Sequence, residues 1–133
     1  MLRNIKDANL IKTLALPAAG ATAYTASVDL AVTSPGEAVR AFDVQVTVDA
    51  TTTLVNTKTC TITLQDSADN SSFADITGTG TMVVTGTSGN VSALTSFQVT
   101  LPVGVRRYIR ASATIPGDGG TCTAFYFTLS LCF

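Results

Sequence analysis

The sequence has no histidine and no tryptophan, and only 13% of its 133 residues are charged. Histidine is the commonest general base and metal ligand, so its absence argues against most catalytic and metal-binding classes. Neither a G-x-S-x-G nor a P-loop spacing occurs to supply a nucleophile or a phosphate site. We therefore expect no enzymatic activity, no metal and no cofactor.

The charges that are present are balanced, with 8 Lys and Arg against 9 Asp and Glu, a net charge of -1. This balance lacks the basic excess with which proteins bind nucleic acid or an anionic membrane. We expect neither of these partners, and we expect the partner to be protein.

Only three cysteines occur, Cys60, Cys122 and Cys132, and they lack the C-x-x-C spacing of zinc and redox sites. An odd number without a convincing export signal favours reduced thiols made in a cytoplasm over a Cys122 bridge to either of the others. We expect Cys60 to pack as a small hydrophobic residue.

The chain is rich in what favours a β-sheet domain: 46% of its residues are hydrophobic, and much of its polarity comes from Thr and Ser. Its mean hydropathy is +0.38. Short runs alternate between apolar and polar residues, as half-buried strands do, and turn residues separate them. The main runs are residues 24–30, 39–48, 58–66, 82–85, 96–101, 105–115 and 125–133.

These patterns predict an all-β fold, an antiparallel, jelly-roll-like β-sandwich of about eight strands over residues 23–133. An extended N-terminal arm precedes it at residues 1–22. The predicted core consists of Phe42, Val44, Val46, Ile62, Leu64, Phe97, Val99, Ile109, Phe125, Phe127, Leu129 and Leu131. The turn-forming cluster at 116–120 predicts a hairpin between the last two runs.

The arm has a weak signal-peptide pattern, with basic residues before residues 14–19 and an A-x-A match at 21–23. Pro17 and Gly20 interrupt the short apolar segment, and Asp7 lies in the basic region, so we expect an uncleaved arm. It docks either on its own domain or on a neighbour, and we favour a neighbour for at least part of it. None of the predicted core lies in residues 1–16, so their deletion is expected to leave the sandwich folded.

Two further clusters of polar residues have alternative interpretations. Arg106 and Arg110 form either an interface surface or a charged strand edge that prevents wrong pairing, while Arg107 has the parity of the core side. Asp66, Asp69 and Asp75 favour a solvated turn over a calcium site, because the spacing departs from the EF-hand pattern. The predicted interface residues are Leu2, Arg3, Ile5, Lys6, Leu10, Ile11, Lys12, Leu14, Arg106 and Arg110.

Four segments, MLRNIKDANLIKTLALPAAGA, PGEAVRAFDVQVTV, ITLQDSADNSSF and RRYIRASATI, together resemble the cement, or decoration, proteins of tailed-bacteriophage capsids. The resemblance covers most of the chain, and its motifs are structural rather than catalytic. It implies a jelly-roll-like sandwich that binds the outside of an icosahedral shell as a homodimer or homotrimer. It also implies that the protein clamps neighbouring major capsid subunits and resides on the virion surface. The alternative is a carbohydrate- or receptor-binding sandwich of a virion or cell surface, although the lack of tryptophan leaves few aromatic platforms.

Overall fold

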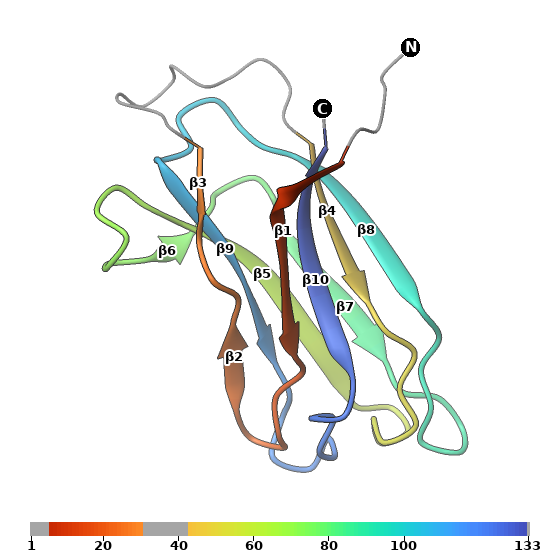
Figure 1. Ribbon diagram of the computed structural model, residues 1–133. Helices are drawn as coiled ribbons and strands as arrows, with labels where there is room; N and C mark the ends of the chain where they lie inside the picture. The colour runs from red at the N-terminus through yellow and green to blue at the C-terminus, as the bar shows by residue number, and fades with distance from the viewer. Residues whose placement is uncertain (1–5, 31–42, 133) are drawn as a thin grey trace.

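The computed structural model describes residues 6–30 and 43–132, which form ten strands (Figure 1). The strands are β1 (Lys6–Ala15), β2 (Thr22–Tyr24), β3 (Val28–Asp29), β4 (Asp43–Val48), β5 (Thr59–Ser67), β6 (Ala74–Asp75), β7 (Thr81–Thr85), β8 (Thr95–Thr100), β9 (Tyr108–Thr114) and β10 (Tyr126–Cys132). No helix occurs in these ranges, so the all-β prediction is confirmed. The strand number exceeds the predicted eight because β1 lies in the predicted arm and the run predicted at 24–30 is divided into β2 and β3.

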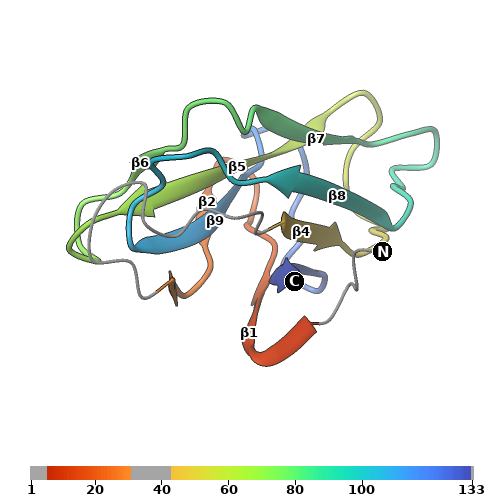
Figure 2. The same ribbon diagram turned by 90° about the horizontal axis from the view of Figure 1, so that it is seen from above.

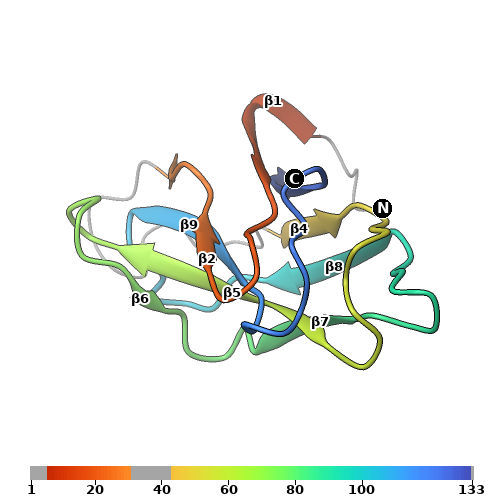
Figure 3. The same cartoon turned by 90° about the horizontal axis from the view of Figure 1, so that it is seen from below.

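The strands form two sheets in which every pair is antiparallel. One sheet has the order β1-β10-β4-β8, and the other has β2-β9-β5-β6, with β3 pairing with β9 and β7 with β5. Seen along the strands, the two sheets lie in separate layers, as Figures 2 and 3 show. The structure is therefore the antiparallel two-sheet sandwich that the alternating runs predict.

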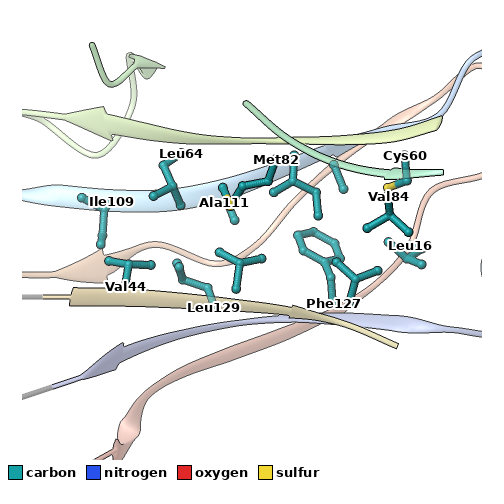
Figure 4. Packing of buried hydrophobic residues seen from close by; sticks show 14 of the residues in the cluster. Leu16, Val44, Cys60, Leu64, Met82, Val84, Ile109, Ala111, Phe127 and Leu129 are labelled. Carbon is teal, nitrogen blue, oxygen red and sulfur yellow. The ribbon is translucent and has the colours of Figure 1, made fainter. Parts of the chain in front are cut away.

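The core lies between the two sheets and consists of the apolar side chains on the inward face of each strand. In β5, the burial alternates strictly from Thr59 to Asp66, so that Cys60, Ile62 and Leu64 are buried and the intervening residues are not. Figure 4 shows Phe127 and Leu129 of the four-stranded sheet pointing toward the side chains of the other sheet. The period of two along each strand thus produces one apolar face on each sheet.

Most of the predicted core is confirmed. The fully buried members are Val44, Val46, Ile62, Leu64, Ile109, Phe127, Leu129 and Leu131. Phe97, Val99 and Phe125 are only half-buried and pack against the margin of the core. The first two lie on β8, which has a neighbour on one side only among the described strands. Phe42 lies outside the described residues.

The predicted C-terminal hairpin is wrong. β9 pairs with β2, β3 and β5, whereas β10 pairs with β1 and β4, so the connection at 115–125 crosses from one sheet to the other. In both strands, alternate residues are apolar. Two strands that are neighbours in one sheet show this pattern, and so do two strands that face each other across the core, so the pattern does not distinguish these arrangements. Here Ile109 and Phe127 belong to opposite sheets and share the core between them.

The arm predicted at residues 1–22 is not separate from the sandwich where the structure describes it. β1 is an edge strand of the four-stranded sheet, and it pairs with β10 from Ile11↔Ser130 to Ala15↔Tyr126. Leu16, at the end of β1, is 1% exposed and belongs to the core. The expectation that residues 1–16 contain no core residue is therefore wrong, because an irregular apolar pattern at an edge strand still supplies a few buried groups.

The run predicted at 24–30 is also interrupted. Tyr24 is exposed and Val28 is buried, although strict alternation along this run would place both on the same face. The break lies at Thr25, whose N–H donates to the Ala111 carbonyl and whose Oγ1 accepts from the Ala111 N–H. This side-chain bond replaces a ladder bond, so the parity changes between β2 and β3.

The buried position of Phe127 makes it the sharpest test of the core. Its side chain is 0% exposed, and it pairs with Val48 on one side and Leu14 on the other. Phe127→Ala should lower the free energy of unfolding by about 3–5 kcal/mol, because it removes buried area and leaves a cavity. Urea unfolding should show a smaller loss for Phe97→Ala, which is half-buried at an edge. A loss below about 1 kcal/mol for Phe127→Ala would contradict the assignment.

The position of β1 predicts that the N-terminal segment stabilises the domain. Leu16→Ala should cost about 2–5 kcal/mol as a large-to-small core substitution. Deletion of residues 1–16 should cost at least as much, because it also removes the partner of β10. Thermal and urea unfolding of both variants would measure this. An unchanged unfolding midpoint for the deletion would show that β1 contributes nothing to the sandwich.

Candidate interaction surfaces

The interface residues predicted on the arm differ in where the structure places them. Leu2, Arg3 and Ile5 lie outside the described residues, and Lys6 is placed on β1 opposite Cys132 by its backbone. Leu10 and Leu14 are half-buried and pack against the core of their own domain. Ile11 and Lys12 are also half-buried. Leu10 and Leu14 thus have a structural role in their own sheet.

Arg106, the first predicted arginine, binds Asp66 of β5. Its Nε donates to Asp66 Oδ1 at 2.8 Å, its backbone N–H donates to Oδ2 at 2.9 Å, and its Nη2 donates to the Asp66 carbonyl at 2.8 Å. The Asp66 side chain is 10% exposed and that of Arg106 is 35% exposed. These bonds attach the segment before β9 to the end of β5, so Arg106 has a partner within its own domain.

Arg107 does not lie on the core side, so the parity assignment was wrong. It is exposed, and its Nε and Nη2 donate to the two carboxylate oxygens of Asp29 at 2.9 and 2.8 Å. The residue precedes the first ladder position of β9, so the strand alternation does not yet apply to it. The hydrogen bonds with Asp29 are the largest cause that raises the pKa of the Arg107 guanidinium, and the negative charge of Asp29 is the second.

Arg110, the second predicted arginine, lies between two aromatic rings on the outer face of the six-stranded sheet. Its guanidinium carbon is 4.1 Å from the ring centroid of Tyr24 and 4.0 Å from that of Phe73. Its Nε donates to Gln65 Oε1 at 2.9 Å, and the Gln65 amide donates to Asp75 at 2.8 Å. We call Tyr24, Phe73 and Arg110 the arginine–aromatic cluster. Tyr24 is 45% exposed, whereas the other two side chains are half-buried.

Sequence reasoning found Arg110 but missed both aromatic residues of this cluster. The sequence gives Tyr24 the same parity as Val28, and the alternation contains no signal of the change of parity at Thr25. Phe73 follows the polar loop 66–72 and precedes β6, so no periodic pattern places it. Only the pairing of β2 and β5 with β9 places these two segments beside Arg110.

The acidic loop has a structural explanation. Asp69 Oδ1 accepts hydrogen bonds from the N–H groups of Ser71 and Ser72 and from Ser67 Oγ. These bonds, that from the Ser72 backbone first, hold the pKa of the Asp69 carboxyl well below its usual range. The carboxylate thus closes its own turn, as Asp does in Asx turns. Within residues 6–30 and 43–132, no group of three or more His, Cys, Asp or Glu residues is placed to hold a metal ion.

A cavity of about 300 Å³ lies between the end of β5 and the segment that follows β8. Asp66, Asp75 and Arg106 contribute the charged groups of its lining, and residues 102–105 form another part of it. The carboxylates of Asp66 and Asp75 already accept hydrogen bonds from Arg106 and Gln65 respectively. The charged side chains of this cavity therefore have partners within the domain.

All three cysteines are free and buried. Burial is the largest cause that raises the pKa of the Cys60 thiol to about 12, with the nearby Cys122 as the second cause. The Cys60 thiol is protonated at neutral pH and is a weak nucleophile, as a buried structural cysteine is. The expectation that Cys60 packs as a small hydrophobic residue is confirmed, since it is 1% exposed.

The Arg106–Asp66 contact gives a stability prediction. Asp66→Ala removes the carboxylate that accepts from the Arg106 backbone N–H and Nε, and water replaces it only in part. The loss should be about 1–3 kcal/mol, measured by urea unfolding at neutral pH. Asp118→Ala, which removes the partner of Lys58 at an exposed site, is the control and should change stability little. Equal losses of unfolding free energy in the two variants would mean that the Arg106–Asp66 contact stabilises the domain no more than the exposed Lys58–Asp118 pair does.

Comparison with known proteins adds no assignment: no protein-family model matches the chain, and the search of curated proteins found no match. In the described part of the chain, no helix is long and apolar enough to cross a membrane.

Proposed function

We propose that this chain is a structural virion protein that binds the outside of an icosahedral phage capsid as a homo-oligomer and stabilises the shell. In this role it contacts neighbouring major capsid subunits and holds them together. The resemblance of four segments of the sequence to capsid decoration proteins supports the proposal. The two-sheet sandwich is compatible with it, although many unrelated functions share this architecture.

The observation that carries the proposal is the arginine–aromatic cluster. Tyrosine, arginine and phenylalanine are enriched at protein interfaces, and tyrosine and arginine are frequent among the residues that dominate binding energy. The two rings and Gln65 fix the Arg110 guanidinium before any partner arrives. Such preorganisation lowers the entropy that a long side chain loses on binding.

Stabilisation of a shell follows from linkage. A protein that binds the assembled lattice more tightly than the free subunits shifts the equilibrium toward the lattice. A symmetric oligomer presents the same cluster more than once, so that modest individual contacts combine into a tighter attachment. This mechanism requires no catalytic group.

The cluster also has a feature that favours the alternative, a carbohydrate-binding module. An exposed ring such as Tyr24, beside hydrogen-bonding groups such as Gln65 and Asp75, is an arrangement on which a sugar ring can stack. One face of the Tyr24 ring is covered by Arg110, however, which leaves less of it for stacking. Titration with mono- and oligosaccharides, followed by tyrosine fluorescence, separates the two: saturable binding to sugars favours the alternative.

The proposal is tested on particles from which the protein has been removed. Adding the full chain back should restore bound protein at a fixed stoichiometry and should raise the temperature at which the shells rupture. Stripped particles that are as heat-resistant as decorated ones would contradict the stabilising role. Absence of binding to the shells would contradict the function as a whole.

The cluster itself is tested by comparing Tyr24→Ala and Arg110→Ala with Tyr126→Ala. Tyr126 is a matched control, because it is 49% exposed and lies on β10 in the other sheet. Each cluster variant should weaken binding to stripped particles by roughly 10- to 100-fold, in the range of interface hot spots. Tyr126→Ala should bind like the unmodified chain. Urea unfolding should first show that all three variants are folded. If Tyr126→Ala then weakened binding more than the two cluster variants did, the contact with the shell would lie outside the cluster.

A further inference from the structure

One long segment of the chain is free of charged residues. Residues 76–105 contain no Asp, Glu, Lys or Arg, although at 13% overall a run of 30 residues would hold about four. This segment includes β7, β8 and their connection, and both strands lie on the same side of the molecule (Figures 2 and 3). Depletion of charged residues is typical of the centre of protein interfaces.

Among the other edge strands of the described sheets, β1, β2, β3 and β6 have features that prevent further pairing, whereas β7 lacks them but is one residue shorter than β8. β1 has an irregular register between Lys6 and Ile11, and Lys12 pairs with the buried Leu129, which places a lysine on the inward parity. β2, β3 and β6 are only two or three residues long. Bulges, inward-facing charges and short strands are the known means by which proteins protect sheet edges.

β8 has none of these protections. It pairs with β4 in a regular register over six residues, and it contains no charged residue and no proline. Its inward-facing Phe97 and Val99 are only half-buried, because no described strand lies beyond them. The segment around it is also apolar: Val83, Val91, Leu94 and Val103 are four of the six exposed large hydrophobic residues in the described chain.

We propose that β8 pairs antiparallel with β8 of a second copy of this chain across a two-fold axis, which joins the two four-stranded sheets into one of eight strands. A register centred on Gln98 places Phe97 opposite Val99 of the other copy and Ser96 opposite Thr100. Residues opposite each other in an antiparallel pair point to the same side. The apolar face and the polar face therefore both continue across the junction.

The absence of charge on β8 favours a second copy of this chain as the partner at its free edge. A two-fold contact brings each surface patch against itself, so a charged residue near the axis meets its own like charge. A neutral strand has no such repulsion and is self-complementary. Among the described residues, Asp43 on β4 is a charged group in contact with β8, and its pKa is lowered by its hydrogen bonds from Thr100 and Gln98. The two copies of Asp43 would lie three strand spacings apart across the sheet and four residues apart along the strands, about 20 Å in total, beyond the Debye length at physiological salt.

This contact specifies the oligomer of the proposed function and rests on it for its biological role. Its test uses the free protein alone, however, so a failure of capsid binding would not affect the result. Sedimentation equilibrium of the full chain over a range of concentrations should give a mass twice that of the 13.7 kDa chain. A chain that remains monomeric at all concentrations up to about 1 mM, at which even a weak contact is populated, would overturn the proposal.

Substitutions that introduce a charge at position 98 test whether the two copies meet through β8. Gln98→Lys and Gln98→Glu should each raise the dimer dissociation constant at least about tenfold, because the same charge meets itself at the axis. Gln98→Thr keeps the strand neutral and should dimerise like the unmodified chain. Thr13→Lys introduces the same charge on β1, the opposite edge of the same sheet, and should leave the dimer unchanged.

Circular dichroism and urea unfolding serve to confirm that each variant is folded, so that a change of mass reports association. A dimer that is insensitive to charge at position 98, or one that dissociates with Thr13→Lys instead, would contradict pairing through β8. An oligomer of three or more copies would also contradict it, since a two-fold strand pair closes at two.

Discussion

The fold depends on the position of β10, the last strand of the chain, between β1 and β4. Phe127 at its centre pairs with Leu14 from the N-terminal strand and with Val48 from the middle of the chain, and it packs in the core between the sheets. Three segments far apart in the sequence therefore form one sheet only when β10 is in place. Because these contacts close long loops, they lose much chain entropy before the burial of apolar groups compensates it.

The surface of the sandwich is polar mainly through hydroxyl and amide groups rather than charge. Neighbouring strands share hydrogen bonds between side chains on the outer faces, such as Thr13–Thr128, Thr22–Thr114, Thr47–Ser96 and Thr63–Ser112. The three ion pairs in the described chain join elements through Lys58, Arg106 and Arg107. The charged residues are thus used largely within the domain. Recognition of the proposed partners would then depend on shape, aromatic groups and strand edges rather than on long-range electrostatic attraction.

The two surfaces proposed for binding lie on different parts of the sandwich. The arginine–aromatic cluster involves β2, β9 and the segment before β6, on the outer face of the six-stranded sheet. β8 is at the far edge of the other sheet. Their separation allows one copy to contact another through β8 while each copy keeps its cluster free for the shell. This is the arrangement that a multivalent clamp requires.

The sequence alone determined the fold class and most of the core. In the runs that contain Val44, Ile62, Ile109 and Phe127, strict alternation identified which residues face inward, because side chains on a strand alternate between the two faces. Tertiary structure alone decided which strands are neighbours. Alternation gives the face of a residue but not the strand beside it, so the predicted hairpin of β9 and β10 proved to be two strands of opposite sheets. The same limit applies to the site: Arg110 was identifiable as a candidate, but Tyr24 and Phe73 come from segments that only the pairing with β9 and β5 places around it.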